Sequence, residues 1–514
     1  MKITTSILAF LFFSINLVGQ KYDYNIEHFG NMEGNVSTFV TDVLDWSDAP
    51  KYITSVPAFR GFETNLVRKG EDKIIKNKLG APLKNCYNFE TLVIDNRFFK
   101  LFLNRNKKDK KLYRVLAEFN SDAQYIDVRY IDTLAYEKKE NFPKQQLFSS
   151  ADSSYFLTID VIDKNKKKEN FSTLCKVYDS NFNQIRKFMY VKKGKDSQRR
   201  TGYLTGGINN NGDVFLVHKL FEKPNRGYKK IDGEKVPAYD LEVTVNQYSK
   251  ENKKYILKDN NNFISTMKLL FDHENKPIFV GQVLRDQEYD SFVKGLSIHT
   301  FKDDQFNSTI HIFDKSQIEN FGNWGGKNKQ GIKPNSKINS NYLVSNSEIH
   351  FQIENILEEY ENDAMGKTLK SVARSSIVFS ISNTGVLNDY MHLPKFHQNY
   401  YFEIESILFL LGGKPALLYY DKVENLEIDL KDYKKFKEFR GIFGNSGKTA
   451  LILGYKNENG SVVREHFEET IKMNSNLKCY DYDKTKKELK LLMMSDLSVF
   501  KKPDVNIFTL KDLH

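Results

Sequence analysis

Polar turns alternate with short apolar runs along most of the chain. In GGINNNGDVFLVHKL (206–220), the turn around Asn211-Gly212 leads into a run of β-branched and aromatic residues that suits a buried strand. The same turn-and-strand pattern returns in five further segments: 89–103, 148–161, 268–283, 341–355 and 406–420. This recurrence predicts a repeat protein built from β-meanders.

Each of these segments is followed by a second half that reads as strand, polar turn and strand. Apolar Leu241, Val243 and Val245 alternate with polar residues, which is typical of half-buried strands. The six second halves are 111–131, 172–191, 241–259, 294–314, 375–393 and 449–468. Two halves make a four-stranded antiparallel sheet that cannot bury both of its faces alone, so neighbouring sheets must stack on it. We therefore expect an all-β fold, a β-propeller of about seven four-stranded blades, with six or eight as alternatives and with loop and short-helix insertions.

The first twenty residues have a different pattern. A positive start at Lys2 precedes the apolar run Ile7–Val18, and polar residues follow Gln20. This order predicts a signal peptide over 1–20; a buried N-terminal strand is the alternative. A signal peptide makes the protein secreted or periplasmic, and association with the outer surface of the cell is one form that this location can take. No later segment reaches the length of a transmembrane span. Residues 21–514 are expected to form one β-propeller domain, in which the irregular stretch 21–87 is a candidate to complete the last blade.

Charge and cysteine content narrow the function classes. The formal net charge is +11, but Lys is scattered over turns with Asp and Glu interleaved, which indicates a solvated surface and no nucleic-acid partner. A polyanionic partner such as an acidic glycan is the alternative. The three cysteines (Cys86, Cys175 and Cys479) exclude a disulfide framework, although one pair can form, and mid-strand Cys175 is expected to be a small buried apolar group.

Catalytic and metal motifs are missing from the sequence. GIFGNSGKT (441–449) lacks the glycine spacing of a P-loop, and a strand follows where a helix is needed. No HExxH or CxxC occurs, and His392 and His397, on either side of Pro394, are expected to share a loop as surface or interface histidines. We expect no metal and no cofactor, and a non-enzymatic protein is favoured over an enzyme.

Five insertions interrupt the repeats and are the expected carriers of specificity, because loops on a rigid sheet scaffold carry binding function. They span 191–204, 221–240, 320–337, 354–374 and 429–439, and the last two have the spacing of short helices. Arg199, Arg200 and Tyr203 in the first insertion, with Trp324 and Lys327 in the third, are candidate binding residues. Aromatic faces stack on sugar or peptide groups, and Arg contacts carboxylates through two hydrogen bonds. Solvated loops without a ligand are the alternative.

The apolar leader, the composition rich in Lys, Asn, Tyr and Phe, and the six hairpin pairs together resemble secreted, largely uncharacterised β-propeller proteins of bacteria. The repeated motifs of WD40, kelch and sialidase propellers are missing from the chain, so no activity of those groups is implied. The absence of catalytic motifs beside well-developed loops favours an exported, non-enzymatic propeller that binds a protein or glycan partner in the cell envelope or outside the cell. A propeller-fold polysaccharide hydrolase or lyase with an axial active site is the alternative, and a structural subunit of an envelope assembly is a third reading. Neither ligand identity nor oligomeric state follows from the sequence.

Overall fold

Strands dominate the computed structural model of the chain. The residues that it describes are 22–31, 40–45, 51–58, 61–68, 77–78, 86–94, 97–106, 108–120, 125–135, 144–163, 171–190, 201–223, 227–248, 252–284, 292–322, 331–334, 336–345, 347–363, 366–399, 406–429, 432, 435–439, 448–471, 473–474, 480–495 and 504–513. Within these ranges there is one α-helix, α2 (Lys315–Asn320). No helix among them is long and apolar enough to cross a membrane. The expected signal peptide lies outside the described residues.

Each of the six sequence repeats forms one four-stranded antiparallel sheet, as the alternation predicted. The first three sheets are β6 (Cys86–Ile94), β7 (Arg97–Asn106), β8 (Lys111–Phe119) and β9 (Tyr125–Ala135); β10 (Lys144–Ser149), β11 (Tyr155–Asp163), β12 (Phe171–Asp179) and β13 (Gln184–Tyr190); and β14 (Thr201–Ile208), β15 (Val214–Phe221), β18 (Tyr239–Asn246) and β19 (Lys253–Leu257). The next three are β20 (Ile264–Phe271), β21 (Pro277–Leu284), β22 (Val293–Lys302) and β23 (Gln305–Ile312); β24 (Lys337–Val344), β25 (Glu348–Asp363), β26 (Gly366–Ser382) and β27 (Leu387–Asn399); and β28 (Ile407–Leu411), β29 (Lys414–Lys422), β30 (Thr449–Lys456) and β31 (Val462–His466).

The two ends of the chain share a further sheet. Strand β1 (Tyr22–Asn31) pairs antiparallel with β35 (Asp504–Asp512), from Tyr22 opposite Asp512 to Asn31 opposite Asp504. The same sheet continues through β34 (Glu488–Ser495) to β32 (Met473–Asn474) and β33 (Tyr480–Asp483). The ring of Tyr24 lies 4.8 Å from that of Phe467 and 6.0 Å from that of Phe508, so aromatic contacts as well as the backbone ladder hold β1 in place.

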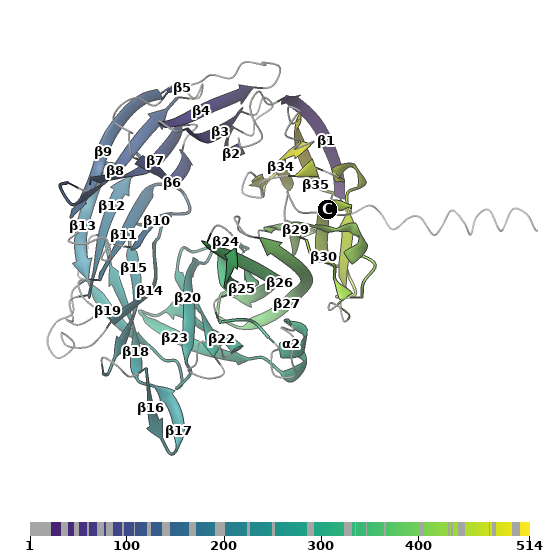
Figure 1. The fold of residues 1–514 in the computed structure, drawn as a ribbon. Coiled ribbons are helices and arrows are strands. Elements are labelled where there is room, and N and C mark those ends of the chain that lie inside the picture. Colours follow the sequence, from purple (N-terminus) through teal and green to yellow (C-terminus); the bar gives the residue numbers. More distant parts are fainter. Residues whose placement is uncertain are drawn as a thin grey trace, which may run out of the picture.

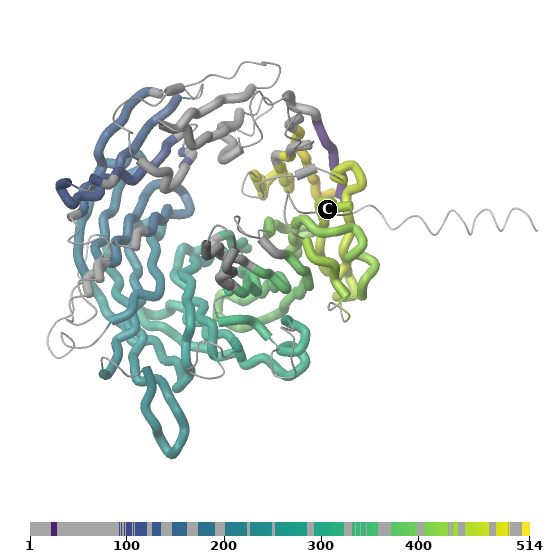
Figure 2. The backbone as a smooth tube through the Cα atoms, viewed as in Figure 1, coloured from purple at the N-terminus to yellow at the C-terminus, as the bar shows by residue number. Residues whose placement is uncertain are grey.

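Another four-stranded sheet precedes the repeats: β2 (Val40–Asp45), β3 (Lys51–Ala58), β4 (Gly61–Arg68) and β5 (Asn77–Lys78). Figure 1 shows the sheets arranged around a central opening, with β1 beside β34 and β35. The colours in Figure 2 follow the chain around this ring in sequence order. This radial order of small antiparallel sheets is a β-propeller. The number of blades stays a prediction.

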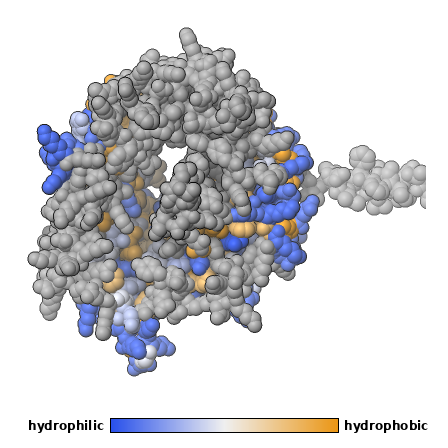
Figure 3. Space-filling view, in the orientation of Figure 1, coloured by the Kyte–Doolittle hydropathy of each residue, from blue (hydrophilic) through white to orange (hydrophobic). Residues whose placement is uncertain are grey.

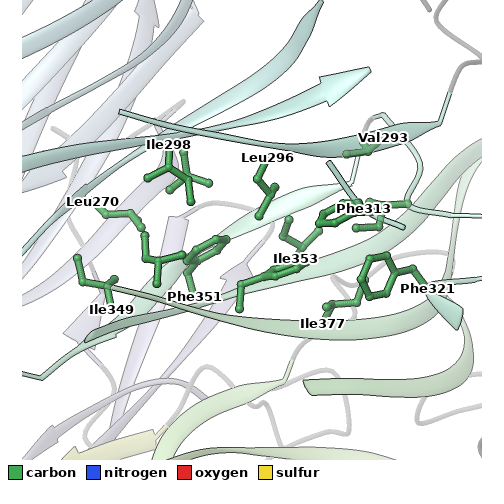
Figure 4. Packing of buried hydrophobic residues seen from close by; sticks show 14 of the residues in the cluster. Leu270, Val293, Leu296, Ile298, Phe313, Phe321, Ile349, Phe351, Ile353 and Ile377 are labelled. Atoms are coloured by element: carbon green, nitrogen blue, oxygen red, sulfur yellow. The ribbon is translucent and has the colours of Figure 1, made fainter. Parts of the chain in front are cut away.

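The hydrophobic core lies between neighbouring sheets, as expected for sheets that cannot bury both faces alone. Figure 4 shows Leu270, Leu296 and Ile298 of sheet β20–β23 packed against Phe351 and Ile353 of sheet β24–β27. All five belong to one cluster of buried side chains. Cys175, in β12, is fully buried, as the sequence predicted. Its thiol is unpaired, and burial raises its pKa.

The expectation of short helices in the insertions is partly wrong. Residues 354–374 belong to β25 and β26, which continue beyond their sheet as a two-stranded ribbon up to the pair Asp363 and Gly366. The helix-like spacing of apolar residues there was overridden by backbone pairing across the hairpin. In the segment 429–439, Asp432 and Lys435 adopt the 3₁₀ conformation. Helix α2, capped by the Asp314 side chain, was not expected from the sequence.

The diglycine Gly206-Gly207 permits close packing of strand β14. A Cβ atom on Gly206 would lie 2.7 Å from Cδ1 of Ile159, a residue of the neighbouring sheet, and 3.0 Å from the carbonyl oxygen of Phe215. A Cβ atom on Gly207 would lie 2.9 Å from Leu269, on the other neighbouring sheet. Sheet β14–β19 is therefore packed tightly on both sides along its first strand.

We expect Gly206→Ala to lower the free energy of unfolding by about 1–3 kcal/mol, because the methyl group overpacks the interface. Urea unfolding measures this loss. The matched control is Gly202→Ala in the same strand, where the new Cβ atom would lie 3.6 Å from its nearest neighbour and the change is expected to stay within about 0.5 kcal/mol. Equal effects of the two variants would contradict the packing argument.

Candidate functional site: the loop face

The connections divide between two faces of the ring. In the six repeat sheets, the first and second strands and the third and fourth strands are joined by turns of two to six residues, such as Gly412-Gly413 and 209–213. We call the face that carries them the turn face. All other connections leave the opposite edge, which we call the loop face, and they include 17 residues at 222–238 and 26 at 423–448. All five insertions singled out in the sequence belong to this loop face.

Contacts between neighbouring sheets show that the faces are continuous. On the turn face, the backbone N–H of Asp152 donates to Asn210 Oδ1 (3.3 Å), and the N–H of Asn210 donates to Asn275 Oδ1 (3.3 Å). These residues occupy equivalent turns of three successive sheets. Turns therefore meet turns around this part of the ring, and the long connections share the other side.

Toward the loop face, an ion cluster joins sheets β6–β9 and β10–β13. Arg114 in β8 contacts Asp132 in β9 and Asp160 in β11, and Lys176 in β12 also contacts Asp132. We call these residues the Arg114 cluster; each is at most 8% exposed. Two cations balance two carboxylates, so these acids serve the interface between the sheets.

An aromatic and polar cluster joins the next pair of sheets at the same level. The ring of His218 in β15 stacks on Tyr190 in β13 at 4.0 Å, and its Nε2 lies 3.1 Å from Thr173 Oγ1. The Tyr190 hydroxyl donates to Glu242 Oε1 (2.8 Å). Burial, with a smaller effect of Lys254, lowers the pKa of His218 to about 3, so the imidazole is neutral at physiological pH.

A third cluster surrounds Glu354 of β25. Lys395 Nζ lies 2.8 Å from Glu354 Oε2, and the hydroxyls of Ser376 and Ser406 each donate to Oε1 at 2.8 Å. Glu354 and Lys395 are 1% and 2% exposed. Sequence reasoning missed this cluster because the partners of Glu354 lie 22 to 52 residues after it along the chain.

The two histidines beside Pro394 belong to a strand, β27, so the expectation that they share a loop is wrong. His397 is 3% exposed and faces the sheet β28–β31, in agreement with the interface reading. Its Nε2 lies 3.8 Å from Asp421 Oδ1, a carboxylate neighbour that the sequence did not reveal. Burial raises the pKa of Asp421 to about 7 and lowers that of His397 well below its ordinary value.

Buried asparagines fasten two of the loop-face insertions. The amide nitrogen of Asn355 donates to the carbonyls of Phe321 (2.7 Å) and Gly331 (3.2 Å), and the N–H of Gly331 donates to the carbonyl of Gly322 (2.8 Å). These bonds fix both ends of the segment 323–330. Trp324 and Lys327, the candidate binding residues in it, lie outside the described residues.

Asn425 likewise holds the backbone of the connection that follows β29. Its amide nitrogen donates to Asp421 Oδ1 (2.8 Å) and to the carbonyl of Lys437 (2.9 Å), while its oxygen accepts from the N–H of Lys437 (2.7 Å). The Arg464 guanidinium donates to the carbonyl of Ile428 (2.6 Å). The polar atoms beneath this connection therefore hold its backbone.

Of the candidate residues in the first insertion, Arg199 and Arg200 lie outside the described residues. Tyr203 lies in strand β14, half-buried, and its hydroxyl donates to Gln146 Oε1 (2.7 Å). Its ring meets His218 edge-on at 5.7 Å, and burial raises the pKa of its hydroxyl. The structure thus brings Tyr203 to the cluster of His218, Tyr190 and Glu242.

The buried carboxylates of the described ranges all have partners. Asp132, Asp160, Glu242, Glu354 and Asp421 each accept from a cation, a hydroxyl or an amide inside an interface between or within sheets. Among the residues that the structure describes, no group of three or more His, Cys, Asp or Glu side chains is placed to hold a metal ion. Strand β30 begins at Thr449, so a strand does follow the P-loop-like segment, as predicted.

No family model matches the chain, and no curated protein matches it. Among solved structures, the chain is similar to the β-propeller domain of the Trilobed protease from Pyrococcus furiosus, with 9% identity, 70% of this chain and 94% of that chain covered, and a TM-score of 0.30. It is similar to an α-L-arabinofuranosidase from Fusarium graminearum in complex with an iminosugar inhibitor (9% identity, 68% and 97% covered, TM-score 0.32). It is also similar to the Trypanosoma rangeli sialidase in complex with sialic acid (10% identity, TM-score 0.31); this match covers 74% of this chain but only 55% of the sialidase. At these identities and TM-scores none of them assigns an activity to this chain.

Proposed function

We propose that the protein is an exported, non-enzymatic β-propeller that binds a protein or glycan partner through its loop face, in the cell envelope or outside the cell. The observation that carries this proposal is the separation of the connections: tight turns cover one face, and the long insertions leave the other. A stable ring requires only short turns, so long insertions on one face are typical of a binding surface.

The polysaccharide hydrolase or lyase alternative needs a pair of carboxylates available to a substrate. The buried carboxylates in the described part of the chain are instead engaged in the interfaces given above. These five carboxylates are therefore not available as such a pair. The proposal places Arg199, Arg200, Trp324 and Lys327 at the binding surface.

A glycan array probed with the chain from residue 21 onward tests the function. We expect Trp324→Ala combined with Lys327→Ala to weaken binding of the recognised glycan at least tenfold, because an aromatic residue that stacks on a ligand contributes about 2 kcal/mol or more. The control is Lys414→Ala combined with Lys484→Ala, which should stay within twofold. Both residues are exposed. Lys414 follows the turn Gly412-Gly413, and the turn of Lys484 lies beside it, because Asp512 accepts from the N–H of Gly412 and donates its own N–H to the carbonyl of Lys487.

Binding to protein ligands is measured in the same way, with purified envelope proteins immobilised in place of the glycans. Release of reducing ends from a bound polysaccharide would identify the enzyme alternative instead. Binding that is insensitive to the loop-face variants but lost in the turn-face control would contradict the proposed surface.

A further inference from the structure

One loop-face connection forms a hairpin that stands apart from the sheets of the ring. Strands β16 (Tyr228–Ile231) and β17 (Glu234–Pro237) lie within the connection 222–238, between β15 and β18, and pair with each other. At the base of the hairpin, the N–H of Glu222 donates to the carbonyl of Ala238 (2.8 Å). The ring therefore holds the hairpin at its base, and Figure 1 shows its strands extending beyond the ring.

The outer edges of this hairpin are open. Among the strands that the structure describes, β16 and β17 pair with no strand except each other. All side chains from Lys229 to Lys235 are exposed, and the surface of the hairpin is mostly hydrophilic in Figure 3. A two-stranded sheet is only marginally stable in water, and its unpaired backbone groups are a template for a further strand. Because Pro237 has no backbone N–H, β16 offers the more complete edge.

The two faces of the hairpin differ in how their charges are paired. On one face, Lys230 lies directly opposite Lys235, and like charges in this position destabilise a sheet. The Nζ atom of Lys235 lies 5.2 Å from the centre of the Tyr228 ring, and no carboxylate among the described residues pairs with either lysine. On the other face, Lys229 pairs with Glu222. One face therefore carries two opposed cations without a counter-charge, which indicates an acidic partner.

We propose that the outer edge of β16 binds an extended acidic segment of a partner protein, which adds to the hairpin as a third strand. This inference rests on the proposed function and names the partner as a protein. An open strand edge is matched by another peptide backbone, whose hydrogen bonds supply affinity, and carboxylates beside Lys230 and Lys235 supply specificity. A neutral strand leaves the two ammonium groups opposed, whereas an acidic strand balances them.

Peptide binding tests the inference directly. The probe is an eight-residue peptide that alternates Glu and Thr, and its binding to the chain from residue 21 onward is measured by fluorescence anisotropy at low and high salt. Lys230→Glu with Lys235→Glu reverses the two charges, and Lys414→Glu with Lys484→Glu makes the same change of formal charge at exposed positions of the turn face. We expect the first variant to bind the peptide about tenfold more weakly and the second to stay within about twofold. Thermal unfolding confirms that both variants fold.

Two further peptides separate strand addition from charge attraction alone. A peptide that alternates Lys and Thr is expected to bind the variant Lys230→Glu with Lys235→Glu more tightly than the parent, because the charges of both partners are reversed. N-methylation of alternate residues in the Glu-Thr peptide keeps its carboxylates and removes half of its backbone N–H groups, and we expect it to lower affinity about tenfold. Unchanged affinity of the N-methylated peptide would overturn strand addition.

The remaining outcomes each overturn a stated part of the inference. Equal losses in the two double variants overturn the location on the hairpin. Tighter binding of polygalacturonate than of the Glu-Thr peptide overturns the protein assignment, and a dimer of this chain that the Lys230 and Lys235 variant dissociates in sedimentation assigns the edge to a second copy. If no acidic peptide binds but the Trp324 and Lys327 variant still loses another ligand, this inference fails and the proposed function survives.

Discussion

Replacing Arg114 with methionine is expected to lower the free energy of unfolding by about 3–5 kcal/mol, because it leaves buried carboxylates without their cation. Arg114 is 1% exposed and contacts both Asp132 and Asp160. Asp132 keeps Lys176, but Asp160, fully buried, loses its ion-pair partner. Burial already raises the pKa of Asp160, so the side chain must become protonated or admit water when Arg114 is removed. Urea unfolding followed by circular dichroism measures the loss.

Two further variants separate the buried charge from other effects. Arg97→Met removes an arginine that is 38% exposed and pairs with Glu118 at 2.8 Å, and it should cost about 0–1 kcal/mol because water screens that pair. Combining Arg114→Met with Asp160→Leu removes the stranded charge together with its cation and should recover much of the lost stability. If Arg114→Met alone stays within about 1 kcal/mol of the parent, the cluster does not hold the two sheets together.

The sheets could be predicted from the sequence because the alternation of apolar and polar residues is a local signal. Leu241, Val243 and Val245 alternate with polar residues, and polar turns mark each hairpin, so strand and turn both follow from neighbouring residues. The 354–374 segment shows the limit of local signals. Ile356 and Tyr360 are spaced as in a helix, yet they pair with Ala373 and Leu369 across a hairpin whose tip the spacing does not mark.

The clusters between the sheets could not be predicted from the sequence, because they depend on residues that are far apart along the chain. Asp160 lies in FLTIDVID and Lys176 in STLCKVYD, and each resembles the polar position of a half-exposed strand. Only the stacking of sheet on sheet places Arg114, 46 residues before Asp160, against that carboxylate.

A second large effect is expected in acid, and it comes from His218. Burial lowers the pKa of this histidine to about 3 in the folded state, whereas the unfolded chain titrates near 6.5. Because the folded pKa is the lower one, the unfolded state binds the extra proton, and the stability from the neutral imidazole is complete above about pH 6.5 and is lost as pH falls toward 3. Between pH 7.5 and 4.5 the loss from this one group is about 2–3 kcal/mol.

Substitution isolates that contribution from other titrating groups. Asp421, whose pKa is raised by burial to about 7, acts in the opposite direction, so only differences between variants are informative. His218→Phe keeps an aromatic ring against Tyr190, 4.0 Å away, and removes the titration; we expect its stability relative to the parent to improve by about 2–3 kcal/mol from pH 7.5 to 4.5. Thr173→Val, the control, removes only the 3.1 Å contact of His218 Nε2 and should keep the parent's pH dependence. Urea unfolding at both pH values measures the change, and parallel profiles for His218→Phe and the parent would show that His218 is not held neutral by burial.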